Sequence, residues 1–156
     1  MDNLTKSEIN KLQKNLSLIR KLAGWSAAEL GDKIGVTKQT IGNLENNNTE
    51  MTKTQYIAIR AVLDYEMNNN IDNETLAQVV AALLDSENLS EEDQKKVEET
   101  MAFVSGAAER GVKKDTIKKV MNAILTTLGV AATVVATSKI AAKNSNPYPW
   151  IGKINK

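Results

Sequence analysis

Five polar side chains fall within one short stretch and are suited to hydrogen bonding with the edges of nucleic-acid bases. Asn43 follows Gln39 by four residues and Thr40 by three, so these side chains share one face if the stretch is helical. Gln and Asn form paired hydrogen bonds with adenine, and Lys donates to the acceptors of guanine. We therefore expect Lys38, Gln39 and Asn43 to contact base edges, with Thr37 and Thr40 divided between helix capping and phosphate contacts.

The composition argues against most kinds of catalytic or metal site. The chain of 156 residues contains neither Cys nor His. Zinc sites depend on these two residues, and general acid–base catalysis most often uses His. The sequence also lacks a glycine-rich phosphate-binding loop. We expect no catalytic residue, no metal and no cofactor, which leaves a carboxylate-based enzyme as a distant third interpretation.

Local signals around the polar stretch predict two short helices joined by a tight turn. Gly24 ends a first helix, and Ser26 caps the next, with Glu29 placed to complete a capping box. Gly35 interrupts the chain again, and Thr37 caps the helix that follows. The predicted helices cover residues 7–22, 27–34, 38–45 and 53–67, with a fifth from residue 72 or 73. Such a corner places its second helix across the major groove of DNA.

The same stretch resembles the Xre, or lambda-repressor-like, family of helix-turn-helix DNA-binding domains. The resemblance covers roughly Leu12 to Tyr65, less than half of the chain. It departs at Gly31, where the family more often has Ala, and at Ala27, where Gln often contacts phosphate. The matching residues are Ile19-Arg20, Gly24-Trp25-Ser26, Glu29-Leu30-Gly31, Ile34-Gly35-Val36-Thr37, Thr40-Ile41 and Leu44-Glu45.

Several residues outside the third helix acquire expected roles. The resemblance implies that Arg20 and Glu45 form an ion pair between the first helix and the end of the recognition helix, so we expect a structural pair and not a catalytic carboxylate. Trp25, just before a cap, is expected to pack in the core. Thr52 and Lys53 start the fourth helix, where outward-pointing N–H groups favour phosphate contacts.

Charge divides the chain into three unequal parts. Residues 1–70 carry nine Lys/Arg and eight Asp/Glu, a net charge of +1; residues 71–110 carry three and ten, or −7; residues 111–156 carry eight and one, or +7. Complementary charge would allow the last two parts to pair within the fold. A nearly neutral first part predicts weak binding by one copy, because many cation–phosphate contacts are needed for tight binding. We therefore expect a dimer on a two-fold operator.

An uncharged stretch over residues 120–138 has two alternative interpretations. Its length is at the edge of what spans a bilayer, and lysines flank it on both sides. It also carries a heptad-like seam that would pack in a soluble helical assembly. The seam consists of Ile117, Met121, Ile124, Leu128, Ala131 and Val135. The tail over residues 144–156 contains Pro147 and Pro149 and is expected to be extended.

Together these patterns predict an all-α protein: a five-helix lambda-repressor-like DNA-binding domain over residues 1–86, a helical appendage for oligomerisation or membrane anchoring over 87–143, and an extended tail. The expected function is sequence-specific transcriptional regulation by a repressor of the phage or mobile-element type, bound to double-stranded DNA as a homodimer through its C-terminal helices. The alternative is a non-enzymatic interaction protein, antitoxin-like or a phage accessory factor. The N-terminus lacks a signal-peptide pattern, so we expect a cytoplasmic location, with inner-membrane tethering through 120–138 as the alternative.

Overall fold

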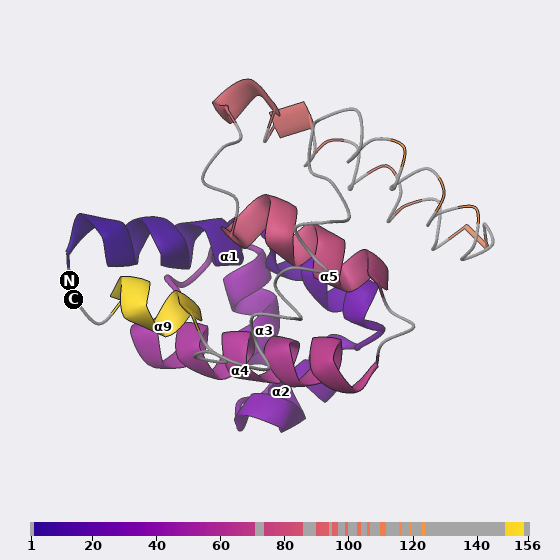
Figure 1. Ribbon diagram of the computed structural model, residues 1–156. Helices are drawn as coiled ribbons and strands as arrows, with labels where there is room; N and C mark the ends of the chain where they lie inside the picture. The colour runs from indigo at the N-terminus through magenta and orange to yellow at the C-terminus, as the bar shows by residue number, and fades with distance from the viewer. Residues whose placement is uncertain are drawn as a thin grey trace.

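The computed structural model describes residues 2–70, 74–85, 90–93 and 149–154, together with single positions between 95 and 123. Every regular element assigned in these residues is a helix, which confirms the all-α prediction. The elements are α1 (Asn3–Ala23), α2 (Ala27–Ile34), α3 (Lys38–Glu45), α4 (Lys53–Asn69), α5 (Glu74–Val80), the π-helical turn η1 (Ala81–Asp85) and α9 (Pro149–Ile154). In Figure 1, α2 lies at the bottom of the view, and α9 lies between α1 and α4.

One hydrophobic core joins these helices. α1 contributes the apolar stripe that its helical period predicts. The core includes Ile9, Leu12, Leu16 and Ile19 of α1, Leu30 of α2, Ile41 and Leu44 of α3, Ile59 and Leu63 of α4, and Leu76 of α5. Burial of one such aliphatic side chain contributes about 1.5–3 kcal/mol relative to leaving it exposed. Because α3 is buried along one side, its opposite side is fixed toward solvent.

The first helix begins earlier than the sequence predicts. The expected start was Ser7, but α1 begins at Asn3, and the Asp2 carboxylate caps it by accepting from the Thr5 N–H at 2.7 Å. Thr5 is only 1% exposed, so the added turn packs against the rest of the domain. The physical reason for the difference is a capping residue at the very start of the chain, whose turn is held by tertiary packing.

Two glycines shape the turn between α2 and α3. Gly35 adopts φ +79°, a left-handed conformation that costs a residue with a Cβ about 1–2 kcal/mol. The Val36 N–H donates to the Gly31 carbonyl at 2.9 Å. A Cβ added to Gly31 would lie 2.6 Å from the Val36 carbonyl oxygen. The predicted hinge at Gly35 is confirmed, and the departure from Ala at Gly31 has a local cause, since the turn passes too close for a methyl group.

The C-terminal tail differs from the prediction. Extended chain was expected over residues 144–156, whereas Pro149–Ile154 form the helix α9. Proline is compatible with the first turn of a helix, because the N–H that it lacks has no intrahelical acceptor there. Trp150 and Ile154 are each 2% exposed, and α9 packs against α1. Pro149 therefore starts a helix that tertiary packing stabilises.

Most of the predicted appendage, residues 87–143, lies outside the described residues, as does the stretch 120–138 apart from Ala123. Within the described part, no helix combines the length and the apolar character needed to cross a membrane. The Ser90 hydroxyl accepts from the Asp93 N–H at 3.2 Å, a hydrogen bond typical of a helix N-cap. The boundary at residue 86 and the role of the appendage stay predictions.

Candidate nucleic-acid interface

α3 turns its apolar side to the core and its polar side to solvent. Ile41 and Leu44 are fully buried. Lys38 and Gln39 are exposed in the first turn, and Asn43 is half-buried one turn later. The three side chains predicted to contact base edges therefore lie at the surface of one short helix. This is the arrangement that a helix inserted into a major groove requires.

Thr37 and Thr40 hold the start of α3 through their hydroxyl groups. Thr37 is the N-cap, and its Oγ1 accepts from the Thr40 N–H at 3.1 Å. The two hydroxyl oxygens lie 3.0 Å apart and share one hydrogen bond. Whichever hydroxyl donates, the hydrogen of the other is left to bond outward, because a single O–H serves the pair. The pair can therefore cap the helix and still donate to one phosphate oxygen.

The connection after α3 adds a polar group that sequence reasoning missed. The Asn48 N–H donates to the Asn43 carbonyl at 2.9 Å, and the Asn48 side-chain nitrogen lies 3.5 Å from Asn43 Oδ1. Asn47 has φ +57°, which Asn tolerates better than most residues with a Cβ. Asn48 is exposed, so its amide extends the polar surface around Asn43. From the sequence alone, this run of three asparagines indicates only a polar turn.

Gln13 organises this connection from inside the domain. Its Nε2 donates to the Leu44 carbonyl at 3.0 Å and to the Thr49 carbonyl at 2.7 Å, while its Oε1 accepts from the Met51 N–H at 2.9 Å. Gln13 is 8% exposed, and a buried amide is stable only when its polar atoms are paired. One side chain on α1 thus holds the chain between α3 and α4. The sequence feature that could have indicated this role is a glutamine next to Leu12 on the apolar side of α1.

The start of α4 carries the second group of predicted contacts. Thr52 Oγ1 accepts from the Gln55 N–H at 3.1 Å, and Gln55 Oε1 accepts from the Thr52 N–H at 2.9 Å, which forms a capping box. Thr52 is exposed, and Lys53 is half-buried. The positive end of the helix dipole favours an anion here. Phosphate binding by Thr52 and Lys53 stays a prediction.

Arg20 and Glu45 connect α1 to the end of α3. Arg20 Nε donates to Glu45 Oε1 at 2.5 Å, and Nη2 donates to Oε2 at 3.2 Å. Nη1 donates to the Trp25 carbonyl at 2.8 Å, so the same guanidinium also holds the turn between α1 and α2. Both charged side chains are 12% exposed. Because both oxygens of Glu45 are engaged, this carboxylate positions the recognition helix. Trp25 itself is half-buried against the core, and Lys33 Nζ lies 5.0 Å from its ring centre.

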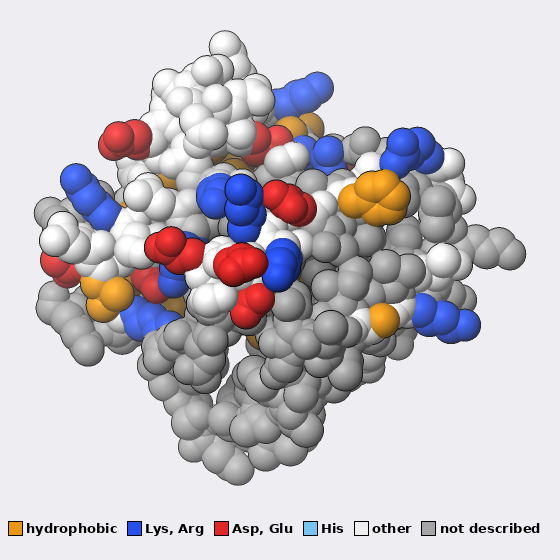
Figure 2. Space-filling model, turned by 90° about the horizontal axis from the view of Figure 1, so that it is seen from above, with side chains coloured by type: hydrophobic (Ala, Val, Ile, Leu, Met, Phe, Trp, Pro, Cys, Tyr) orange, Lys and Arg blue, Asp and Glu red, His pale blue; other side chains and the backbone are white. Residues whose placement is uncertain are grey.

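Charges of both signs are mixed on the surface. Figure 2 shows Lys/Arg and Asp/Glu side chains interleaved on one face of the molecule. Residues 1–70, which contain the candidate site, have a net charge of +1. A nearly neutral segment attracts phosphate weakly at long range, so the predicted DNA contacts depend on α3 and the start of α4.

Comparison with known proteins identifies the part of the chain that contains this site. Residues 16–70 match a family model described as helix-turn-helix. Antitoxin HipB of Escherichia coli strain K12 is 37% identical over 57 residues, which cover 36% of this chain and 65% of the relative. Antitoxin HipB of Escherichia coli O6:H1 strain CFT073 is 35% identical over 57 residues, or 36% of this chain and 61% of the relative. The match thus spans less than two thirds of either relative.

No solved structure matches the chain significantly. The matched segment contains α2, Gly35 and α3, whose arrangement has helix-turn-helix geometry. Residues 16–70 are therefore similar to the helix-turn-helix family, in agreement with the resemblance found in the sequence.

Proposed function

We propose that this protein is a sequence-specific DNA-binding regulator that reads its operator with α3 and acts without enzymatic chemistry. Lys38, Gln39 and Asn43 contact base edges, and Thr37 or Thr40 bonds a flanking phosphate. The observation that carries the proposal is the division of α3 into a fully buried apolar side and a polar side at the surface. The helix-turn-helix family match over residues 16–70 supports it.

The proposed regulator is a homodimer and a repressor. One nearly neutral domain offers few phosphate contacts, and a second copy on a two-fold operator doubles them. The helical appendage over residues 87–143 supplies the dimer contact in this proposal. A bound dimer represses by occupying DNA that other proteins need. Such a protein works in the cytoplasm, where its DNA lies.

A second candidate is an antitoxin-like interaction protein. The observation that favours it is the printed description of the two relatives from Escherichia coli, both of which are named antitoxins. In this case the helix-turn-helix domain is a scaffold, and the important surface is one that binds a partner protein. Reading of bases by α3 would then be dispensable for the cellular activity.

Selection of DNA fragments followed by substitution on α3 separates the two functions. Genomic fragments bound by the full chain are isolated, and their affinity is measured for wild type and for the double variant Gln39→Ala/Asn43→Ala. Each lost amide contact should weaken binding about 10-fold to 100-fold, because one paired contact with a base provides about 1–3 kcal/mol of discrimination. Asn68→Ala, at the exposed far end of α4, is the matched control.

If the double variant binds the selected fragment with the same affinity as wild type, the regulator proposal is overturned. Thermal unfolding of each variant shows whether a loss of binding comes from a loss of structure. Cellular activity that persists in a folded, non-binding double variant would establish the antitoxin-like alternative.

A further inference from the structure

One stripe of α4 runs from the predicted phosphate-facing end of the helix to a buried polar cluster. Thr52, Tyr56, Arg60 and Asp64 follow one another at intervals of four, and residues four apart lie on the same helix face. Thr52 is the exposed cap, while the other three are 1%, 2% and 8% exposed. Burial raises the pKa of Tyr56 to about 12, so its hydroxyl stays protonated. The cap and the cluster are therefore parts of one rigid element.

Trp150 of α9 contacts all three buried residues of this stripe. Its Nε1 donates to Asp64 Oδ2 at 2.6 Å. Its ring meets the Tyr56 ring edge-on, with centroids 5.8 Å apart, and the Arg60 guanidinium carbon lies 5.4 Å from its ring centre. The site thus recognises an indole by one hydrogen bond, one aromatic contact and one cation–π contact.

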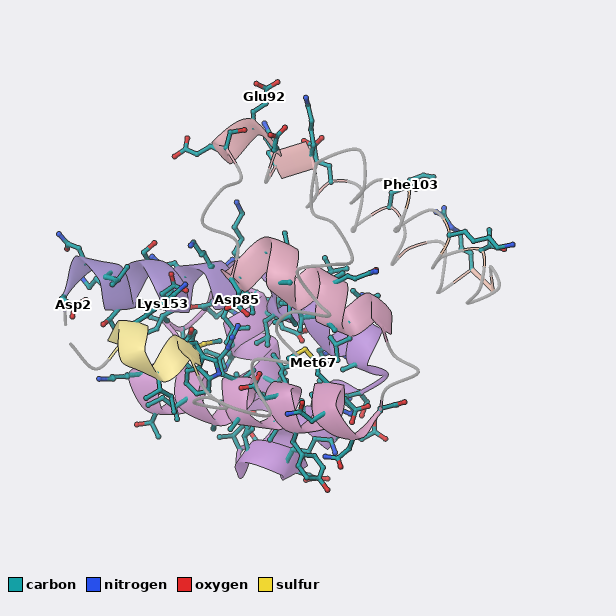
Figure 3. All side chains as sticks on the ribbon, in the orientation of Figure 1. Asp2, Met67, Asp85, Glu92, Phe103 and Lys153 are labelled. Carbon is teal, nitrogen blue, oxygen red and sulfur yellow. The ribbon has the colours of Figure 1, made fainter. Side chains whose placement is uncertain are left out.

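Arg60 also contacts the end of η1. Its Nη2 donates to both carboxylate oxygens of Asp85, the last residue of η1, at 3.0 and 3.1 Å. Figure 3 labels Asp85 on η1 and Lys153 on α9. One guanidinium therefore contacts both η1 and α9, which are far apart in the sequence.

The docked state of α9 has costs that its release would remove. Among the described residues, nothing accepts a hydrogen bond from Arg60 Nε or Nη1, although both atoms are buried. The Asp64 carboxylate is also buried, which raises its pKa. Buried donors without acceptors and buried charges are unfavourable, and water would relieve both if the helix left. The burial of Trp150 and Ile154, both on the six-residue helix α9, provides the favourable free energy that opposes these costs.

We propose that α1 and α4 form a binding site for a short helix led by tryptophan. The helix α9 of this chain fills the site as a separable segment. A filled site stabilises the N-terminal end of α4, which faces phosphate. The last statement rests on the proposed DNA-binding function. The site takes an indole that donates to Asp64 and an aliphatic side chain four residues later, the spacing of Trp150 and Ile154. In this proposal the link to the cap runs through Tyr56, which contacts Trp150 and whose N–H donates to the Thr52 carbonyl at 2.9 Å in the first turn of α4.

The test uses the full chain with Trp150→Ala, which empties the site, and a fluorescein-labelled peptide of residues 146–156. Fluorescence anisotropy should show at least about 10-fold tighter binding of the peptide to this variant than to wild type, whose own α9 competes at a high effective concentration. A peptide with Trp150→Ala should lose at least about 10-fold in affinity, because the buried indole supplies most of the contact. The matched protein control adds Tyr65→Ala, an exposed position on α4 outside the stripe, and should bind as before.

Two outcomes would overturn the binding site. Equal peptide binding by wild type and the emptied variant would show that no site is opened. A variant Trp150→Ala that loses its helical circular dichroism would show that α9 is an inseparable part of the core. Acrylamide quenching of Trp150 in a Trp25→Phe chain provides a second measurement, and unhindered quenching there would contradict docking in solution.

The effect on DNA is measured separately on the selected fragment. Trp150→Ala should weaken binding about 3-fold to 10-fold, and saturating peptide should restore it. The measurement is made at a temperature where the variant is folded. A general loss of stability would not be reversed by the peptide there, so restored DNA affinity points to the site. Unchanged affinity would overturn the coupling to DNA but not the peptide site. The peptide measurement contains no DNA, so a failure of the proposed DNA-binding function leaves its result intact.

Discussion

Two arginines link separate elements of the molecule, Arg20 where α1 meets the end of α3 and Arg60 where α4 meets η1 and α9, and they differ in how they are paired. Arg20 uses Nε, Nη1 and Nη2 in hydrogen bonds to Glu45 and to the Trp25 carbonyl. Arg60 bonds Asp85 through Nη2 alone, and its Nε and Nη1 have no partner among the described residues. The first junction is built to stay closed, and the second carries the cost expected of a contact that opens.

The two arginine–carboxylate pairs each span 25 positions, but the other contacts of the two regions differ in their separation along the sequence. The Ser26 cap and the Gly31–Val36 hydrogen bond join residues only a few positions apart. The bond from Trp150 to Asp64 joins residues 86 positions apart. Local contacts form with little loss of chain entropy, whereas closing a long loop costs more. The corner can therefore be rigid at low cost, while the C-terminal contact depends on a few strong interactions.

Removal of each guanidinium in turn should give the largest changes in the free energy of unfolding. It tests directly whether Arg20 and Arg60 differ in how well they are paired. Arg20→Met leaves the Glu45 carboxylate unpaired in a partly buried place and should lower the free energy of unfolding by about 3–5 kcal/mol. Arg60→Met should cost less than half as much, because two donors without acceptors disappear and Asp85 is 41% exposed. Urea unfolding of both variants measures the difference. Equal losses would show that the two junctions do not differ in kind.

A methyl group added at the corner should give an intermediate effect. In Gly31→Ala the Cβ would meet the Val36 carbonyl oxygen at 2.6 Å, so the turn must move, at a cost of about 1–3 kcal/mol. Gly42→Ala on α3 is the matched control, since its Cβ would meet nothing within 4 Å. Alanine there should leave stability unchanged or raise it by up to about 1 kcal/mol. Thermal unfolding compares the two, and a harmless Gly31→Ala would show that the corner is less tightly packed than described.

The smallest effect concerns the pH dependence of the α9 contact. Burial raises the pKa of Asp64, Asp85 raises it further, and the Trp150 hydrogen bond and Arg60 oppose the rise. The folded protein therefore keeps this proton at pH values where the unfolded chain, with its pKa near 3.8, has lost it. The contribution of Asp64 to stability is greatest below the unfolded value and falls as pH rises to the folded one.

Asp64→Asn removes this titration and keeps an oxygen that accepts from the Trp150 indole. The free energy of unfolding of the variant should accordingly rise relative to wild type between pH 3.8 and the higher folded pKa. Urea unfolding at several pH values measures both chains. Parallel pH profiles would contradict a raised pKa at this position and remove one of the costs assigned to docking.

Sequence reasoning succeeded where structure depends on neighbouring residues. The predicted bounds of α2 and α3 agree with the structure, because Ser26, Thr37 and Gly35 signal caps and turns by their own chemistry. It missed the first turn of α1, where packing of Thr5 stabilises a helix start that the cap alone only permits. Gln13 could be noticed as a polar residue beside Leu12, but its three backbone partners are unknown before the connection between α3 and α4 is in place.

By itself, the sequence determined the all-α class, the capped corner and the choice of residues on the outward side of α3. These follow from helical periodicity and from cap and turn chemistry over a few residues. Only the tertiary structure decided that Pro149–Ile154 form a helix, that Trp150 meets Asp64, and that Gln13 holds the connection after α3. The reason is that their partners lie 31 to 86 positions away and meet only when the core has formed.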